Sequence, residues 1–121
     1  MNIFAVTFKH KDAFNNENNG WGNGYVLIPE GNKLFGMFFD DINKQYSINV
    51  HGGLTFSKLL TERHRELLGE NAIDGNLIPN DIAFWMIGFD TCHIFDNKSN
   101  WSRDDVENET RELLKQVLEI Q

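Results

Sequence analysis

Four segments of the chain carry the alternation or the continuous run of apolar residues that is typical of β-strands. They are residues 2–8, 24–28, 46–57 and 82–89. Apolar and polar side chains alternate most cleanly in the third segment, with His51 on the polar side. We therefore expect a half-buried strand there, bent at Gly52-Gly53. The fourth segment is apolar on both faces, which indicates a central strand covered on both sides.

Two further segments have the spacing of amphipathic helices. Residues 58–70 combine leucines with charged side chains and end at Gly69, a typical helix stop. A longer helix is predicted after Ser102, a favourable N-cap, because its core-facing residues recur at spacings of three and four. These residues are Val106, Thr110, Leu113, Val117 and Ile120. Residues 33–42 fit either a helical turn or a buried loop, since an apolar run of this length has no decisive period.

The order of these segments predicts an α+β fold. We expect a mainly antiparallel sheet of four to five strands, with the C-terminal amphipathic helix packed on one face. The longest connections are an Asn- and Gly-rich loop at residues 10–24 and a polar loop at residues 71–81. The length of 121 residues, without a linker or an internal repeat, predicts a single domain over residues 1–121.

The composition restricts the classes of function. A net charge of −7 disfavours binding to nucleic acid or to an anionic membrane, because both require clusters of Lys and Arg. The sequence contains one cysteine, which excludes an intrachain disulfide. No apolar stretch approaches the roughly 18 residues of a membrane span, and no basic leader precedes the first apolar residues. We therefore expect an acidic cytoplasmic protein.

The first candidate site is the turn His51-Gly52-Gly53. Two glycines after a polar-face histidine leave an open backbone that a ligand can approach closely. Asn49 and Thr55 lie on the same polar side and are predicted binding residues. His51 then acts as a general base, an anion contact or a metal ligand. Alternatively, His51 forms a hydrogen bond to a neighbouring loop and the glycines only make the turn.

The second candidate site is the segment that contains Asp90, His93 and Asp96. These titratable groups follow the central strand directly, and their spacing of three places them on one side of a helical turn. Together with His51, they offer a ligand set for a divalent metal ion. Without a metal, Asp90 would orient His93 as a general acid or base. Alternatively, Asp90 caps the turn that follows the strand.

Three other side chains with reactive groups are predicted to have no part in a functional site. Cys92 is predicted to be a buried structural thiol whose side chain points away from its two titratable neighbours. His10 and His64 lie among charged residues and are predicted to be solvated. The chain has no phosphate-binding loop, nucleophile elbow, dinucleotide fingerprint or cysteine-based zinc motif.

The runs VHGGLTFS (residues 50–57) and WMIGFDTCH (residues 85–93) resemble a group of small uncharacterised proteins of bacteria and their phages. That group pairs motifs of the form HGGLT(F/Y)S and WxxGFDxxH. The similarity extends over most of the chain, whereas residues 58–81 look like an insertion. The resemblance implies that His51, Asp90 and His93 lie together in space and that the protein is phage-related. It implies no activity.

Two functions fit these observations. The first is a binding module, with a pocket at His51-Gly52-Gly53 and Asp90/His93 for a small polar or nucleotide-like ligand, or with a surface there for a protein partner. The second is a small hydrolase of phosphoester-type substrates that uses His51 and His93 with Asp90, with or without a divalent metal ion. We favour the binding module, because the sequence lacks a recognised catalytic signature.

Overall fold

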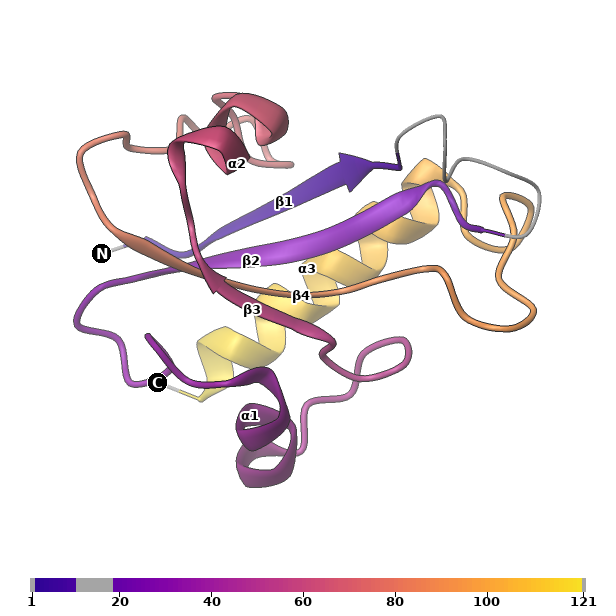
Figure 1. Cartoon of the computed structure of the whole chain (residues 1–121), viewed down its shortest axis with the longest axis horizontal. Coiled ribbons are helices and arrows are strands. Elements are labelled where there is room, and N and C mark those ends of the chain that lie inside the picture. The colour runs from indigo at the N-terminus through magenta and orange to yellow at the C-terminus, as the bar shows by residue number, and fades with distance from the viewer. Residues whose placement is uncertain (1, 11–18, 121) are drawn as a thin grey trace.

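The computed structural model describes residues 2–10 and 19–120, and it confirms the predicted α+β fold. Within these residues, four strands form one antiparallel sheet in the order β1-β2-β4-β3, and three helices pack around it (Figure 1). The strands are β1 (Phe4–Lys9), β2 (Gly22–Pro29), β3 (Phe56–Leu59) and β4 (Phe84–Phe89), and the helices are α1 (Phe39–Tyr46), α2 (Glu62–Leu68) and α3 (Arg103–Glu119). Residues 11–18 of the predicted Asn-rich loop lie outside the described part of the chain.

Both faces of the sheet are covered, because successive residues of each strand point to opposite sides. In β2, Val26 and Ile28 face the core under α3, whereas Leu27 faces a second core on the α2 side. Figure 1 shows α3 crossing behind the strands and α2 on the other side. The strand β4 lies between β2 and β3 and is almost fully buried, as its apolar sequence predicts.

The helix α3 forms as the sequence predicts. Ser102 caps it, and Asp105 completes a capping box by accepting from the Ser102 backbone N–H over 3.1 Å. Its buried residues are Val106, Thr110, Leu113 and Val117, four of the five positions in the predicted stripe. None of the described helices combines the length and the apolar character that crossing a membrane requires.

The prediction of a strand over residues 46–57 is wrong for most of that segment. Tyr46 ends α1, residues 47–55 form a loop, and β3 begins at Phe56. The alternation of burial is nevertheless present, because Val50 and Leu54 are buried in the core under α3. The N–H of Thr55, the residue before β3, donates to the Gly88 carbonyl of β4, but other backbone groups of this loop bind side chains. Asn43 of α1, for example, pairs its side-chain amide with the N–H and carbonyl groups of Leu54.

The predicted helix over residues 58–70 is shorter than expected. Lys58 and Leu59 belong to β3, where they pair with β4. The helix α2 begins after Thr61, whose hydroxyl oxygen accepts from the backbone N–H of His64 over 3.3 Å. It ends at Gly69, as predicted, and none of its residues is fully buried. Of residues 33–42, the first part forms turns and the last part is the beginning of α1.

Candidate functional site

Two loops meet at the edge of the sheet where β4 ends. The strands β3 and β4 are antiparallel, and Phe56 pairs with Gly88, so the loop before β3 lies beside the loop after β4. We call residues 47–55 the His51 loop and residues 90–102 the Asp96 loop. The two candidate sites of the sequence lie in these two loops and are adjacent in space.

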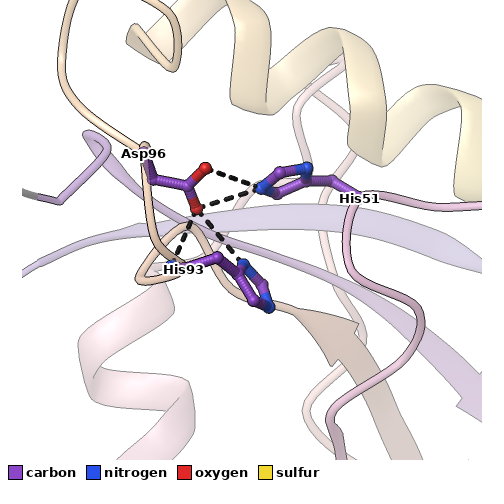
Figure 2. A group of neighbouring side chains, drawn as sticks. All are labelled: His51, His93 and Asp96. Atoms are coloured by element: carbon purple, nitrogen blue, oxygen red, sulfur yellow. Dashed lines mark hydrogen bonds and ion pairs between the residues drawn. The ribbon is translucent and has the colours of Figure 1, made fainter.

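The Asp96 side chain is the centre of the contacts between the two loops. It is buried, with 5% of its surface exposed. Nε2 of His51 lies 3.0 Å from each carboxylate oxygen and donates to them. Nδ1 of His93 lies 3.2 Å from Oδ2, and the His93 backbone N–H donates to the same oxygen over 2.9 Å. Figure 2 shows the carboxylate between the two imidazole rings.

The environment of Asp96 favours its charged form. Burial by itself would raise the pKa of this carboxyl group, because a buried carboxylate loses hydration. The hydrogen bonds from the His51 side chain and from the His93 backbone stabilise the carboxylate and outweigh the burial, so the pKa lies below its ordinary value. Asp96 is therefore negatively charged at neutral pH, and both imidazoles face that charge.

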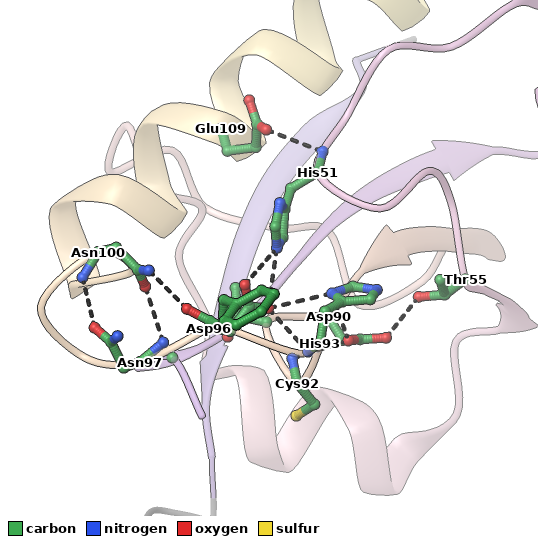
Figure 3. Close-up of polar contacts among 12 residues, drawn as sticks. His51, Thr55, Asp90, Cys92, His93, Asp96, Asn97, Asn100 and Glu109 are labelled. Carbon is green, nitrogen blue, oxygen red and sulfur yellow. Dashed lines mark hydrogen bonds and ion pairs between the residues drawn. The ribbon is translucent and has the colours of Figure 1, made fainter. Parts of the chain in front are cut away.

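Side chains of α3 hold the backbone of the His51 loop in place. The Gln116 amide donates to the Asn49 carbonyl over 2.8 Å and accepts from the Asn49 N–H over 2.7 Å. About two turns earlier on the helix, Oε2 of Glu109 accepts from the His51 N–H over 3.0 Å (Figure 3). Asn49, a predicted binding residue, thus contacts α3 through its backbone, while its exposed side chain stays at the surface.

Asp90 lies beside this cluster and not at its centre. Its Oδ2 accepts from the Thr55 hydroxyl and its Oδ1 from the Cys92 N–H, each over 3.0 Å (Figure 3). Its distance to Nδ1 of His93 is 3.5 Å, longer than the 3.2 Å from Asp96 to the same nitrogen. Asp90 therefore caps the turn after β4, which is the second of the two roles that the sequence suggested for this residue. Through Asp90, Thr55 ties the two loops together.

Gly52 and Gly53 form the turn that follows His51. Gly52 and Gly53 have φ angles of 70° and 74°, in the left-handed region that glycine tolerates. The His93 ring lies against Gly52, since a Cβ atom there would come within 2.5 Å of Nε2 and Cε1. At Gly53, the nearest atom to such a Cβ is Nδ2 of Asn43, at 3.7 Å. Gly52 is exposed, as expected of an open backbone, but the His93 ring occupies the side on which a Cβ atom would project.

Trp101 and Glu109 complete the surroundings of His51, and the sequence analysis missed both. The ring centroids of Trp101 and His51 lie 4.3 Å apart, with the planes tilted by 37°. On its other side, His51 meets the edge of His93 at a centroid distance of 4.9 Å. Trp101 and Glu109 lie 50 and 58 positions after His51, so no short sequence spacing relates either residue to it. The one sequence signal for Trp101 is weak, namely that this tryptophan directly precedes Ser102, the predicted N-cap of the C-terminal helix.

Ile94 and Phe95 project from the Asp96 loop, and we call them the Ile94–Phe95 tip. They are 82% and 89% exposed. Phe95 has a φ angle of 74°, which is strained for a bulky side chain. The carbonyl of Phe95 accepts from the Asn100 side chain over 2.8 Å, and the Asp96 N–H donates to the His93 carbonyl over 3.0 Å. The loop is therefore held on both sides of the tip.

The predictions that Cys92 is buried and that His10 is solvated are both wrong. Cys92 is exposed, and its Sγ lies 3.5 Å from Nε2 of His10. Partial burial and then the negative charge of Asp90 raise the pKa of the Cys92 thiol, so it is not an activated nucleophile. His10 is buried, and its ring nitrogens face the carbonyl oxygens of Gly20 and the Asn23 side chain. The sequence did not indicate this burial, because His10 stands between two lysines, Lys9 and Lys11.

Two cavities lie on the α2 side of the sheet, away from the two loops. The larger, of about 730 Å³, lies between α2 and residues 77–81. The smaller, of about 200 Å³, lies between α2 and the strands. Neither is lined by a predicted site residue. The His51 and His93 cluster is thus a feature of the surface at the end of the sheet and not a wall of either cavity.

No protein-family model, curated protein or solved structure matches the chain. An α+β architecture by itself does not specify a function, because the same architecture hosts many unrelated activities. What the protein does is therefore inferred from the two loops and from the side chains that they present.

Proposed function

We propose that the protein is a binding module that engages a protein partner through the Ile94–Phe95 tip. The observation that carries this proposal is Phe95, which is both strained at a φ angle of 74° and 89% exposed. Strain and apolar exposure each reduce stability or solubility, and they typically coincide at functional surfaces. Because hydrogen bonds hold the loop on both sides, the tip loses little conformational entropy when it binds.

The tip suits a partner whose surface offers an apolar pocket with a basic rim. An aromatic side chain that fills a pocket contributes a large share of the binding energy of an interface. The net charge of −7 favours encounter with a basic surface and disfavours nucleic acid. A small polar or nucleotide-like ligand at His51 and His93 is less well supported, since the two cavities described above lie elsewhere.

Site-specific photo-crosslinking in cells of the native host tests this proposal. A photoreactive residue replaces Phe95, and in a control protein it replaces Phe38, which is 54% exposed beside α1. We expect a discrete adduct at position 95 alone, which purified wild-type protein prevents and the Phe95→Asn variant does not. The captured protein, once purified, should bind Phe95→Asn at least about tenfold more weakly. Equal adducts at both positions would contradict the proposal.

The same residue allows a prediction about stability. Phe95→Asn should raise the free energy of unfolding by about 1 kcal/mol, because Asn adopts the left-handed region with less strain than Phe. The matched control is Ile94→Asn, which also makes an exposed apolar residue polar but has no positive φ angle. Its effect should stay within about 0.5 kcal/mol. Urea unfolding measures both, and a destabilised Phe95→Asn variant would show that the Phe95 ring supports the fold.

The alternative function, hydrolysis of a phosphoester-type substrate, has one supporting observation. A buried carboxylate orients His51 through a hydrogen bond, as in a catalytic His–Asp pair. The carboxylate is that of Asp96 and not of Asp90. Turnover of a chromogenic phosphodiester that disappears in His51→Gln and persists in His64→Gln would favour this alternative over the binding module.

We also propose that the protein is cytoplasmic and phage-related. An exposed free thiol at Cys92 suits a reducing compartment. The paired motifs around His51 and His93 support kinship with the small bacterial and phage proteins that they resemble. Cell fractionation with an antibody against the native protein tests the location.

A further inference from the structure

We infer that His51, His93 and Asp96 form a binding site for a divalent transition metal ion, independently of the proposed partner. Each of the three residues offers one ligand atom, and these atoms all lie within 4.8 Å of one another. Two imidazoles with one carboxylate suit Zn²⁺, Co²⁺, Ni²⁺ or Cu²⁺, whereas Mg²⁺ and Ca²⁺ prefer oxygen ligands. This combination of donors is the same as in zinc sites with two histidines and one carboxylate.

The two distances from the Asp96 carboxylate to the histidine nitrogens are close to those that such an ion requires. With metal–ligand bonds of about 2.1 Å, the ligands of a tetrahedral ion lie about 3.4 Å apart. Oδ2 of Asp96 lies 3.0 Å from Nε2 of His51 and 3.2 Å from Nδ1 of His93. Small rotations of the two rings would therefore bring both of these distances to that value. A neutral imidazole that coordinates the ion through its inner nitrogen carries its proton on the other ring nitrogen, so the ion takes the place of the donated hydrogens.

Neighbouring groups hold the three ligands in position, as the outer contacts of metal sites do. The His93 backbone N–H donates to the Asp96 carboxylate. The Glu109 side chain binds the His51 N–H, and the Trp101 ring covers one face of the His51 imidazole. These contacts fix both loops before an ion arrives, which reduces the entropy lost on binding.

Asp90 is not part of the inferred ligand set. Its Oδ1 lies 3.5 Å from Nδ1 of His93, but Asp90 is not among the three residues whose ligand atoms all lie within 4.8 Å of one another. Three protein ligands leave a fourth position for water or for another group, which is typical of zinc sites that act on or bind something else. The sequence-based set of four ligands is thereby reduced to His51, His93 and Asp96.

Calorimetric titration of the chelator-treated, full-length protein with zinc chloride at neutral pH tests the site. We expect one ion per chain in the wild type, and at least about tenfold weaker binding in His51→Gln and in His93→Gln. His64→Gln, on α2, is the matched control and should bind as the wild type does. Magnesium chloride should give no binding heat. Absence of zinc binding in the wild type, or equal affinity in the wild type and both site variants, would overturn the inference.

Fluorescence gives a second readout that locates the ion. Because Trp101 packs on His51, a quenching ion such as Ni²⁺ or Cu²⁺ at the site should reduce tryptophan emission in the wild type. The quenching should be reduced in Trp101→Phe, which keeps Trp85 and also Trp21, whose backbone N–H donates to the Trp101 carbonyl, and it should be lost in His51→Gln. Quenching that persists in His51→Gln would place the ion elsewhere. Phe95→Asn should bind zinc normally, so failure of the partner proposal and failure of this one are distinguishable.

Discussion

Replacing Asp96 with alanine is expected to lower the free energy of unfolding by about 3 kcal/mol in metal-free protein. The carboxylate is buried and accepts from the side chains of His51 and His93 and from one backbone N–H. Without it, that N–H and both imidazoles lose their acceptor, and the two loops lose the contact that joins them. Urea unfolding, followed by circular dichroism, measures the change.

Asp90→Ala is the matched control for this prediction. Asp90 also accepts from a side chain and from a backbone N–H, but its side chain is 33% exposed, so water replaces the lost partner more easily. We expect a loss of about 1 kcal/mol. The conservative Asp96→Asn variant keeps one acceptor oxygen and should fall between the two. If Asp90→Ala cost more than Asp96→Ala, Asp90 and not Asp96 would be the residue that holds the loops together.

The parts of the fold that the sequence predicted are those in which local pattern and tertiary environment agree. The helix α3 has a favourable N-cap at Ser102 and a stripe that meets one face of the sheet. The strand β4 is apolar on both sides because cores lie on both sides. In both cases the residues that set the pattern are the residues that make the contacts.

The His51 loop shows why alternating polar and apolar residues do not by themselves specify a strand. Its alternation of polar and apolar residues arises because Val50 and Leu54 enter the core, and alternation by itself does not specify what binds the backbone. If this segment were a strand, a neighbouring strand would bind its backbone N–H and carbonyl groups. Here Gln116 and Asn43 supply the donors and acceptors from two helices. Their side chains lie 67 and 11 positions from their partners, and no local pattern signals such contacts.

The candidate site was predictable in its composition and less so in its geometry. Spacing pointed to Asp90, His93 and Asp96, and the paired motifs pointed to His51, Asp90 and His93, whereas the structure brings His51, His93 and Asp96 together. The sequence favoured Asp90 as the carboxylate that orients His93, although Asp90 and Asp96 have the same spacing from His93. Burial decides between them, since a buried carboxylate needs its hydrogen-bond donors more than a partly exposed one does.

Replacing Gly52 with alanine should destabilise the protein by about 3 kcal/mol, whereas Gly53→Ala should cost about 1 kcal/mol. Both residues have nearly the same left-handed φ angle, so the backbone strain of an added Cβ is common to the two variants. The difference lies in what the new methyl group meets. At Gly53 the nearest atom is 3.7 Å away, whereas at Gly52 the His93 ring stands at 2.5 Å.

The His93 ring can avoid that methyl group only by turning away from the Asp96 carboxylate, which breaks the 3.2 Å contact between them. Gly52→Ala should therefore combine the strain with the loss of a partly buried hydrogen bond, and it should weaken zinc binding while Gly53→Ala does not. Thermal unfolding with and without zinc chloride measures both effects. Equal losses in the two variants would mean that His93 moves without cost, in which case its contact with Asp96 contributes little to the fold or to the site.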